Sequence, residues 1–129
     1  MATDNAVTLS AGEWRVMEVL WEGPKTLMEL VRELKIRAGW AKSTVATMAR
    51  RMEDKGLIRG EREGRGKRFF PCVERKAVAA AETESLLSRV YQGSVGLMVN
   101  TLLQNTKLSR EELDDLYKIL ERSEEESSC

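Results

Sequence analysis

The chain is 129 residues long, and 42% of its residues are hydrophobic, 33% charged and 5% aromatic. This length limits the protein to one compact domain or two small ones, which can fold without a disulfide or a metal ion. No apolar run approaches the roughly 18 residues of a membrane span. Residues 1–9 also lack the order of a signal peptide. We therefore expect a cytoplasmic protein with no membrane insertion.

The residue types present exclude most catalytic and metal-dependent functions. The chain contains no histidine, which is the commonest general base and a frequent metal ligand. Its two cysteines, Cys72 and Cys129, have neither a metal-ligand spacing nor the spacing of a disulfide framework. The phosphate-binding Walker pattern fails because Arg68 follows Lys67. We predict no enzymatic activity, no metal site and no cofactor, and we expect Cys72 to be buried in an apolar strand.

Charge is unevenly distributed along the chain, although the net charge is zero. Residues 41–80 carry 11 basic and 5 acidic side chains, whereas residues 81–129 carry 5 basic and 10 acidic ones. A basic middle segment is typical of contact with a polyanion. Charged runs also form ordinary solvated helix faces, so both interpretations stay open on charge alone.

Capping signals and apolar spacing predict two short helices in the first 40 residues. A capping box at 10–13 (Ser-Ala-Gly-Glu) opens a helix that ends at Gly23. A second box at 26–29 (Thr-Leu-Met-Glu) opens a helix that ends at Gly39. Trp40, which follows, is expected to wedge between helices in the core.

A third helix is predicted to begin near Ser43 or Thr44 and to run to Lys55. Helical spacing gives it a buried stripe of Val45, Met48, Ala49 and Met52. The other positions face outward, with short side chains first and cations later: Ser43, Thr44, Ala46, Thr47, Arg50, Arg51 and Asp54.

Two β-type runs around a glycine-rich turn, within residues 57–73, predict a β-hairpin. Pro71 restricts the second run to an edge position, or places Pro71 at the end of the strand. The hairpin tip carries Arg65, Lys67 and Arg68. Three helices followed by a hairpin with a cationic tip predict a winged helix-turn-helix, a mostly α fold with a small β-hairpin, over residues 9–73.

Residues 74–122 are predicted to form three helices without a sheet, and residues 1–8 and 123–129 to be disordered. These helices carry more apolar surface than a lone arm can bury, so self-association into a homodimer is expected. The predicted dimerisation residues are Leu86, Val90, Tyr91, Val95, Leu97, Met98, Leu102, Leu103, Leu113, Leu116, Tyr117 and Leu120.

The third helix and the hairpin together meet the geometric requirements of double-stranded DNA. A helix fits the major groove when short side chains lead it and cations flank it. The predicted DNA-binding residues are Ser43, Thr44, Ala46, Thr47, Arg50, Arg51, Arg65, Lys67 and Arg68. Each element of this surface also has a simpler interpretation. Thr44 caps its helix, Arg50 and Arg51 pair with Glu53 or Asp54, and the glycine-flanked turn is merely solvated.

Several motifs in this order resemble the penicillinase-repressor family (BlaI, MecI and CopY type), over about residues 9–121. They are Ser10-x-x-Glu13-Trp14, Leu20-Trp21, Trp40-x-x-x-Thr44-Val45-x-Thr47-Met48, Lys55-Gly56-Leu57-Ile58 and Val90-Tyr91-x-Gly93-Ser94. The resemblance implies a homodimeric bacterial transcriptional repressor. Its winged helix would bind an inverted-repeat operator, and its C-terminal helices would hold two subunits together. The recognition helix would be the one with Ser43, Thr44, Ala46 and Thr47, and the wing would be the 64–67 turn.

The resemblance also implies two ways of releasing the operator, and the chain departs from both. Antibiotic-responsive members are cut at an Asn-Phe bond, whereas this chain has Asn100 followed by Thr101. Asn100–Thr101 is thus the candidate cleavage position, with a membrane sensor protease as the candidate partner. Copper-responsive members end in clustered Cys-x-Cys pairs, whereas this chain has the single Cys129. Copper sensing is therefore not expected.

A second class of function is a winged helix that docks other proteins and never binds DNA, since fold alone does not decide function. A docking module would more often show an apolar patch where this chain has cations. We therefore favour a DNA-binding repressor and keep the docking module as the alternative.

Overall fold

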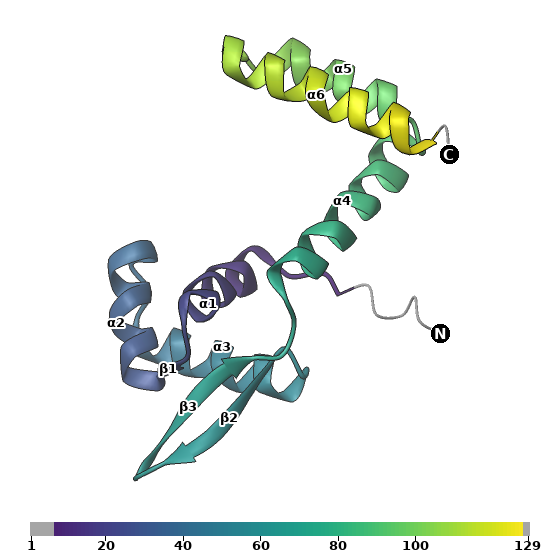
Figure 1. The fold of residues 1–129 in the computed structure, drawn as a ribbon. Coiled ribbons are helices and arrows are strands. Elements are labelled where there is room, and N and C mark those ends of the chain that lie inside the picture. The colour runs from purple at the N-terminus through teal and green to yellow at the C-terminus, as the bar shows by residue number, and fades with distance from the viewer. Residues whose placement is uncertain (1–6, 128–129) are drawn as a thin grey trace. The chain divides into compact units, whose positions relative to one another are not determined.

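The computed structural model describes residues 7–127, which divide into two compact units between Glu84 and Ser85 (Figure 1). The sequence places this boundary earlier, after residue 73. The later division arises because the first turns of the following helix pack on the first unit. Val78 of that helix is buried in the core of the first unit, and Glu82 accepts a hydrogen bond from the backbone N–H of Leu9 at 3.2 Å.

Three helices of the first unit lie where the sequence predicts them: α1 (Ala11–Glu22), α2 (Leu27–Ala38) and α3 (Lys42–Asp54). Both predicted capping boxes are confirmed. The hydroxyl of Ser10 accepts from the N–H of Glu13 at 3.1 Å, and Thr26 accepts from Glu29 at 3.2 Å. α3 has Ala41 at its N-cap and no side-chain cap, so Thr44 does not cap this helix.

A three-stranded antiparallel sheet completes the first unit, with strand order β1-β3-β2. β2 (Ile58–Glu63) and β3 (Gly66–Pro71) form the predicted hairpin, and Gly64 in its turn has φ 61°. β3 is the central strand and Pro71 is its last residue, so the terminal placement of Pro71 is confirmed and the edge placement is wrong. β1 (Lys25–Thr26) was not predicted, because two residues carry no strand pattern of their own.

The core of the first unit lies between α1, α2, α3 and the sheet. It contains Val16, Met17, Val19, Leu20, Leu30, Leu34, Val45, Ala49, Met52, Leu57, Ile58, Phe69 and Val78. Trp40 packs against this core, as predicted. The prediction for Cys72 is wrong: its side chain is exposed, because Cys72 lies just beyond the end of β3.

An aromatic and ionic cluster ties α1 to the start of α4 (Arg75–Tyr91). Trp14 and Trp21 meet edge to face with their ring centroids 5.6 Å apart, and the indole N–H of Trp21 donates to the carbonyl of Val73 at 2.9 Å. Arg75 lies over both rings and forms two hydrogen bonds with Glu18, at 3.1 and 3.0 Å. These contacts explain why the first part of α4 belongs to the first unit.

The second unit contains the end of α4, α5 (Val95–Asn105) and α6 (Arg110–Ser127). α4 ends where Gln92 and Gly93 adopt positive φ, at 52° and 84°. α6 continues to Ser127, so the predicted disordered tail is wrong for residues 123–127. Glutamate is a good helix former, and the hydroxyl of Ser127 donates to the carbonyl of Ser123 at 2.8 Å. The other predicted disordered residues lie outside the described part, except Val7, which packs against the core, and Thr8.

Candidate nucleic-acid interface

α3 presents a polar face to solvent because its apolar stripe is anchored in the core. Val45, Ala49 and Met52 are buried. The predicted DNA-binding residues of α3 lie on the other sides of the helix: Ser43, Thr44, Arg50 and Arg51 are exposed, and Ala46 and Thr47 are half-buried. A shallow groove on this face is lined by Ser43, Thr44, Thr47, Met48 and Arg51. The short side chains of Ser43, Thr44 and Thr47 leave room for another molecule to approach the helix backbone.

Arg50 and Arg51 remain available to an external anion. Neither forms an ion pair with any residue in the described part of the chain, so the simpler interpretation that pairs them with Glu53 or Asp54 does not hold. Glu53 contacts Lys67 instead, at 3.1 Å. The cationic part of the α3 surface is therefore unneutralised.

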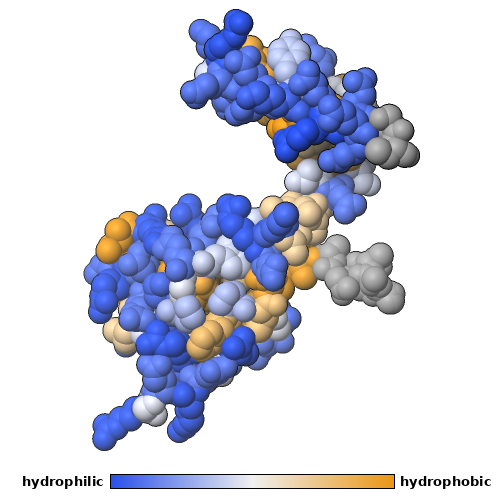
Figure 2. Space-filling model, viewed as in Figure 1, coloured by the Kyte–Doolittle hydropathy of each residue, from blue (hydrophilic) through white to orange (hydrophobic). Residues whose placement is uncertain are grey.

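We define the wing as β2, β3 and the turn between them. It carries the other three predicted cations, two of which form ion pairs with carboxylates of the protein and one of which does not. Arg65 in the turn is exposed and has no ion pair within residues 7–127. Lys67 is held by Glu53, and Arg68 donates to Glu63 through Nε at 2.6 Å and Nη2 at 2.8 Å. The Arg68 guanidinium holds the pKa of Glu63 below its ordinary value, so this pair stays ionised at neutral pH. Figure 2 shows hydrophilic residues over the end of the hairpin.

Sequence reasoning missed Arg62, a cation of the wing without a carboxylate partner among the described residues, and also Arg59, which pairs with Glu61. Arg62 pairs in register with Lys67 across the hairpin, is exposed, and has no ion pair with any described residue. Residues directly opposite each other in an antiparallel pair point to the same face of the sheet. The signal was present in the register of a two-residue hairpin turn, which places residues 62 and 67 opposite each other.

The second unit has a different surface, on which apolar side chains lie among charged ones (Figure 2). α5 and α6 contain no buried residue. Tyr91, Met98 and Leu116 are half-buried, and the other predicted dimerisation residues are exposed: Leu86, Val90, Val95, Leu97, Leu102, Leu103, Leu113, Tyr117 and Leu120. A lone unit therefore leaves most of its apolar surface in water.

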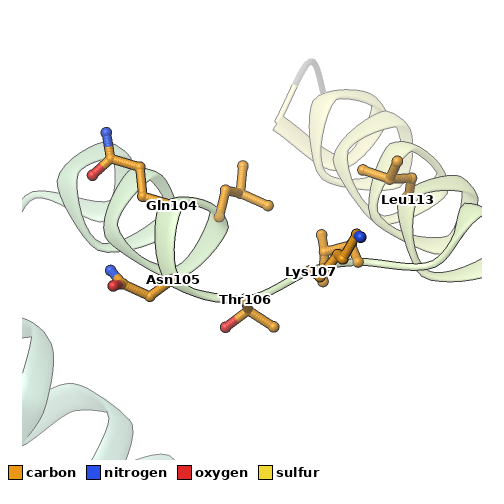
Figure 3. Close-up of a pocket in the computed structure, with 7 residues that line it drawn as sticks. Gln104, Asn105, Thr106, Lys107 and Leu113 are labelled. Carbon is orange, nitrogen blue, oxygen red and sulfur yellow. The ribbon is translucent and has the colours of Figure 1, made fainter.

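The hollow between α5 and α6 does not have the lining of a small-molecule site. It lies at the connection between the two helices, where Figure 3 shows the amides of Gln104 and Asn105 pointing away from Leu113. Its lining is mixed, and no group of charged side chains converges there. Among the described residues, no three Cys, Asp or Glu side chains are placed to hold a metal ion. Cys129 lies outside the described residues.

The candidate cleavage position lies inside α5. Asn100 is exposed and Thr101 is half-buried, and the hydroxyl of Thr101 donates to the carbonyl of Leu97 at 2.9 Å. A protease that binds its substrate as an extended strand would have to unwind α5 to reach this bond. Within residues 7–127, no helix is long and apolar enough to cross a membrane.

Comparisons with known proteins agree with this arrangement. Residues 9–122 match the family model described as "Penicillinase repressor". The chain is 33% identical over 114 residues to a penicillinase repressor of Bacillus licheniformis, covering 88% of this chain and 89% of that protein. It is 23% identical to the methicillin resistance regulatory protein MecI of Staphylococcus aureus (strain N315), covering 88% and 94% of the two chains.

Two solved structures resemble the fold. The first is the DNA-binding domain of the repressor BlaI, with a TM-score of 0.50 and 28% identity over 54% of this chain and 85% of that one. The second is a complex of hsRosR-S4, with a TM-score of 0.55 and 17% identity over 95% of this chain and 96% of that one. The second likeness concerns the fold alone. The predicted fold class, a mostly helical winged helix-turn-helix, is confirmed.

Proposed function

The chain belongs to the penicillinase repressor family, whose members are transcriptional repressors and not enzymes, and on this premise we propose that it represses transcription in the cytoplasm as a DNA-binding homodimer. One observation carries the DNA part of the proposal. The outward face of α3 combines exposed short side chains with two arginines that no described carboxylate neutralises. A surface of this kind complements the base edges and phosphates of duplex DNA.

In the proposed complex, α3 enters the major groove as the recognition helix. Ser43, Thr44, Ala46 and Thr47 would approach base edges, because their short side chains let the helix come close. Arg50 and Arg51 would contact phosphates on the flanking strands, and the wing would reach the adjacent backbone. Base contacts would then set sequence preference, while phosphate contacts would supply most of the affinity.

The homodimer is proposed from the apolar surface of the second unit. Exposed apolar patches of this extent mark association surfaces, and most soluble homo-oligomers are closed dimers. Two symmetric copies would read an inverted repeat with half-sites about one helical turn, ~10 bp, apart. Occupation of such an operator would block RNA polymerase sterically.

The proposed DNA binding is tested by measuring whether the purified protein retains genomic DNA fragments from its source organism over a series of salt concentrations. We expect one fragment to stay bound at salt concentrations that release the others, and footprinting on it to protect an inverted repeat. Arg51→Ala should reduce the salt slope of binding by about 0.9 per subunit for one lost phosphate contact. Thr47→Ala should change base preference with little change in slope.

The alternative function, a docking module that binds proteins, predicts a different result. It requires that no duplex is retained even at low salt and that Arg51→Ala has no effect. The α3 face favours the DNA-binding function, because its exposed residues include short polar side chains and unneutralised arginines, whereas the centre of a protein-docking face is usually rich in aromatic and apolar side chains.

For release of the operator we propose cleavage of the Asn100–Thr101 bond by a membrane sensor protease as the step to test first. The names of the relatives, a penicillinase repressor and a methicillin resistance regulator, support a link to antibiotic resistance. The helical setting of the bond requires that α5 unwinds first. Mass spectrometry of the chain from cells exposed to a β-lactam would show fragments 1–100 and 101–129, and an intact chain would refute this step.

A further inference from the structure

The carboxylate of Glu53 joins the last turn of α3 to the wing. Its Oε2 accepts a hydrogen bond from the backbone N–H of Gly60 at 3.2 Å, and Lys67 Nζ lies 3.1 Å from Oε1 and 3.2 Å from Oε2. β2 is an edge strand of the sheet, and a backbone N–H on such an edge has no partner strand. Glu53 therefore fills a vacant hydrogen-bond position on the wing and binds one of its cations with the same side chain.

The wing is shaped to receive this carboxylate. A Cβ atom built on Gly60 would lie 2.8 Å from Lys67 Cδ, 3.0 Å from Glu53 Oε2 and 3.3 Å from Phe69 Cε1. A side chain at position 60 would therefore force Lys67, Glu53 or both to move from these positions. The glycine is needed here because of this close approach and not because of its φ angle, which is not positive.

The cations of the wing fall into two groups according to whether a carboxylate of the protein holds them. Arg59 belongs to the held group, because it pairs with Glu61 at 3.0 Å. Lys67 is held by Glu53, and Arg68 by Glu63 and Glu29. Arg62, directly opposite Lys67, and Arg65, in the turn, have no carboxylate partner within the described residues. Only this second group is free to bind an anion without first breaking an ion pair inside the protein.

We propose that Glu53 is a positioning residue that holds the wing against the recognition helix, and that Arg62 and Arg65, rather than Lys67 and Arg68, are the wing's contacts to DNA phosphates. The assignment of phosphate contacts rests on the proposed DNA binding. The positioning role of Glu53 does not, since it is a property of the free protein.

The phosphate assignment is tested by salt-dependent binding of the full-length chain to a fluorescent duplex of mixed sequence. Arg62→Ala and Arg65→Ala should each lower the slope of log affinity against log salt by about 0.9 per subunit. Lys67→Ala is the matched control, because it removes the same charge from the opposite position of the same hairpin, and it should change the slope by less than half as much. An equal loss for Lys67→Ala, or no loss for Arg62→Ala, would overturn the assignment.

The positioning role is tested by amide hydrogen exchange at Gly60. A hydrogen bond to a carboxylate protects its donor strongly, so Glu53→Ala should accelerate exchange of the Gly60 N–H by about tenfold or more. Glu53→Gln keeps an oxygen acceptor and should restore most of the protection. The amides of Val19 and Leu20 in the core report general unfolding and should not change. If Glu53→Ala leaves Gly60 exchange unaltered, Glu53 does not hold the wing.

The two measurements test the two parts of the proposal independently. If the wild-type chain retains no duplex at low salt, the proposed function and the phosphate assignment are both refuted, while exchange at Gly60 still decides the role of Glu53. If the duplex is retained and Gly60 exchange does not respond to Glu53→Ala, DNA binding stands and the positioning role is wrong.

Discussion

Glu13 is a buried carboxylate, 5% exposed, that has two partners in different parts of the chain. Its Oε1 accepts from the N–H of Ser10 at 2.9 Å and closes the capping box of α1, while its Oε2 binds Lys55 at the end of α3. Burial raises the pKa of Glu13, but Lys55 and the Ser10 N–H outweigh it, so the pKa lies below its ordinary value of 4.5. The charged form is therefore the stabilising one.

This shift predicts how stability depends on pH. Because the folded-state pKa of Glu13 is lowered, its contribution is complete above pH 4.5 and is lost as the pH falls through the folded-state pKa. Glu13→Gln should lower the free energy of unfolding by about 1–2 kcal/mol at neutral pH. The difference from wild type should shrink as the pH falls below 4.5 and through the folded-state pKa. Urea unfolding followed by tryptophan fluorescence measures this in the first unit, since Trp14, Trp21 and Trp40 all lie there.

A double-mutant cycle with Lys55→Met isolates the ion pair from the cap. The coupling free energy between positions 13 and 55 should be about 1 kcal/mol at neutral pH and should diminish as the pH falls through the folded-state pKa of Glu13. A coupling that is independent of pH would show that Lys55 contributes packing rather than charge.

At the scale of elements, local sequence signals predicted the helices and the hairpin. They did not predict contacts between residues that are distant in the sequence. Each capping box of the first unit spans only four consecutive residues, so it can be recognised from the sequence, and the structure contains both. β1 escaped prediction because it exists only by pairing with Arg68 and Phe69 of β3, more than 40 positions away. The predicted cations of the candidate site were correctly located on α3 and the wing, yet their ion pairs could not be read from the sequence. The partner of Lys67 lies 14 positions earlier in the chain.

Two glycines of the wing, Gly60 and Gly66, should respond differently to substitution by alanine. A Cβ at Gly60 would collide with Lys67 and Glu53, whereas a Cβ at Gly66, on the neighbouring strand, would meet nothing within 4 Å. Gly60→Ala should therefore lower the free energy of unfolding of the first unit by about 1–2 kcal/mol, as overpacking does. Gly66→Ala should leave it unchanged or raise it by up to about 1 kcal/mol, because alanine loses less conformational entropy on folding.

Urea unfolding of the two variants, monitored as above, is the measurement, and each variant is the control for the other. Equal effects of Gly60→Ala and Gly66→Ala would show that the space around Gly60 adapts and that the contact with Glu53 is not constrained there.

At the scale of the whole molecule, basic and apolar surfaces are separated along the chain. Residues 41–80, which include α3 and the wing, have an excess of basic side chains, whereas residues 81–129 have an excess of acidic ones. In the proposed complex, DNA phosphates would repel the acidic α6, so α6 would not compete with α3 for DNA. Its apolar residues, with those of α5, need another surface to cover them. This separation fits one unit that contacts DNA and another that contacts a second copy.

The proposed dimer predicts a change in both assembly and DNA binding when its surface is altered. Leu102 of α5 is 53% exposed, and Leu102→Glu would place a charge in the apolar contact, so sedimentation should show a monomer. Gln104→Glu, two positions away on the same helix and also exposed, adds the same charge outside the predicted set and should leave the dimer intact. Because a monomer makes the phosphate contacts of one subunit only, the salt slope of binding should fall to about half for Leu102→Glu. A dimeric Leu102→Glu variant, or equal disruption by Gln104→Glu, would exclude this face of α5 from the interface.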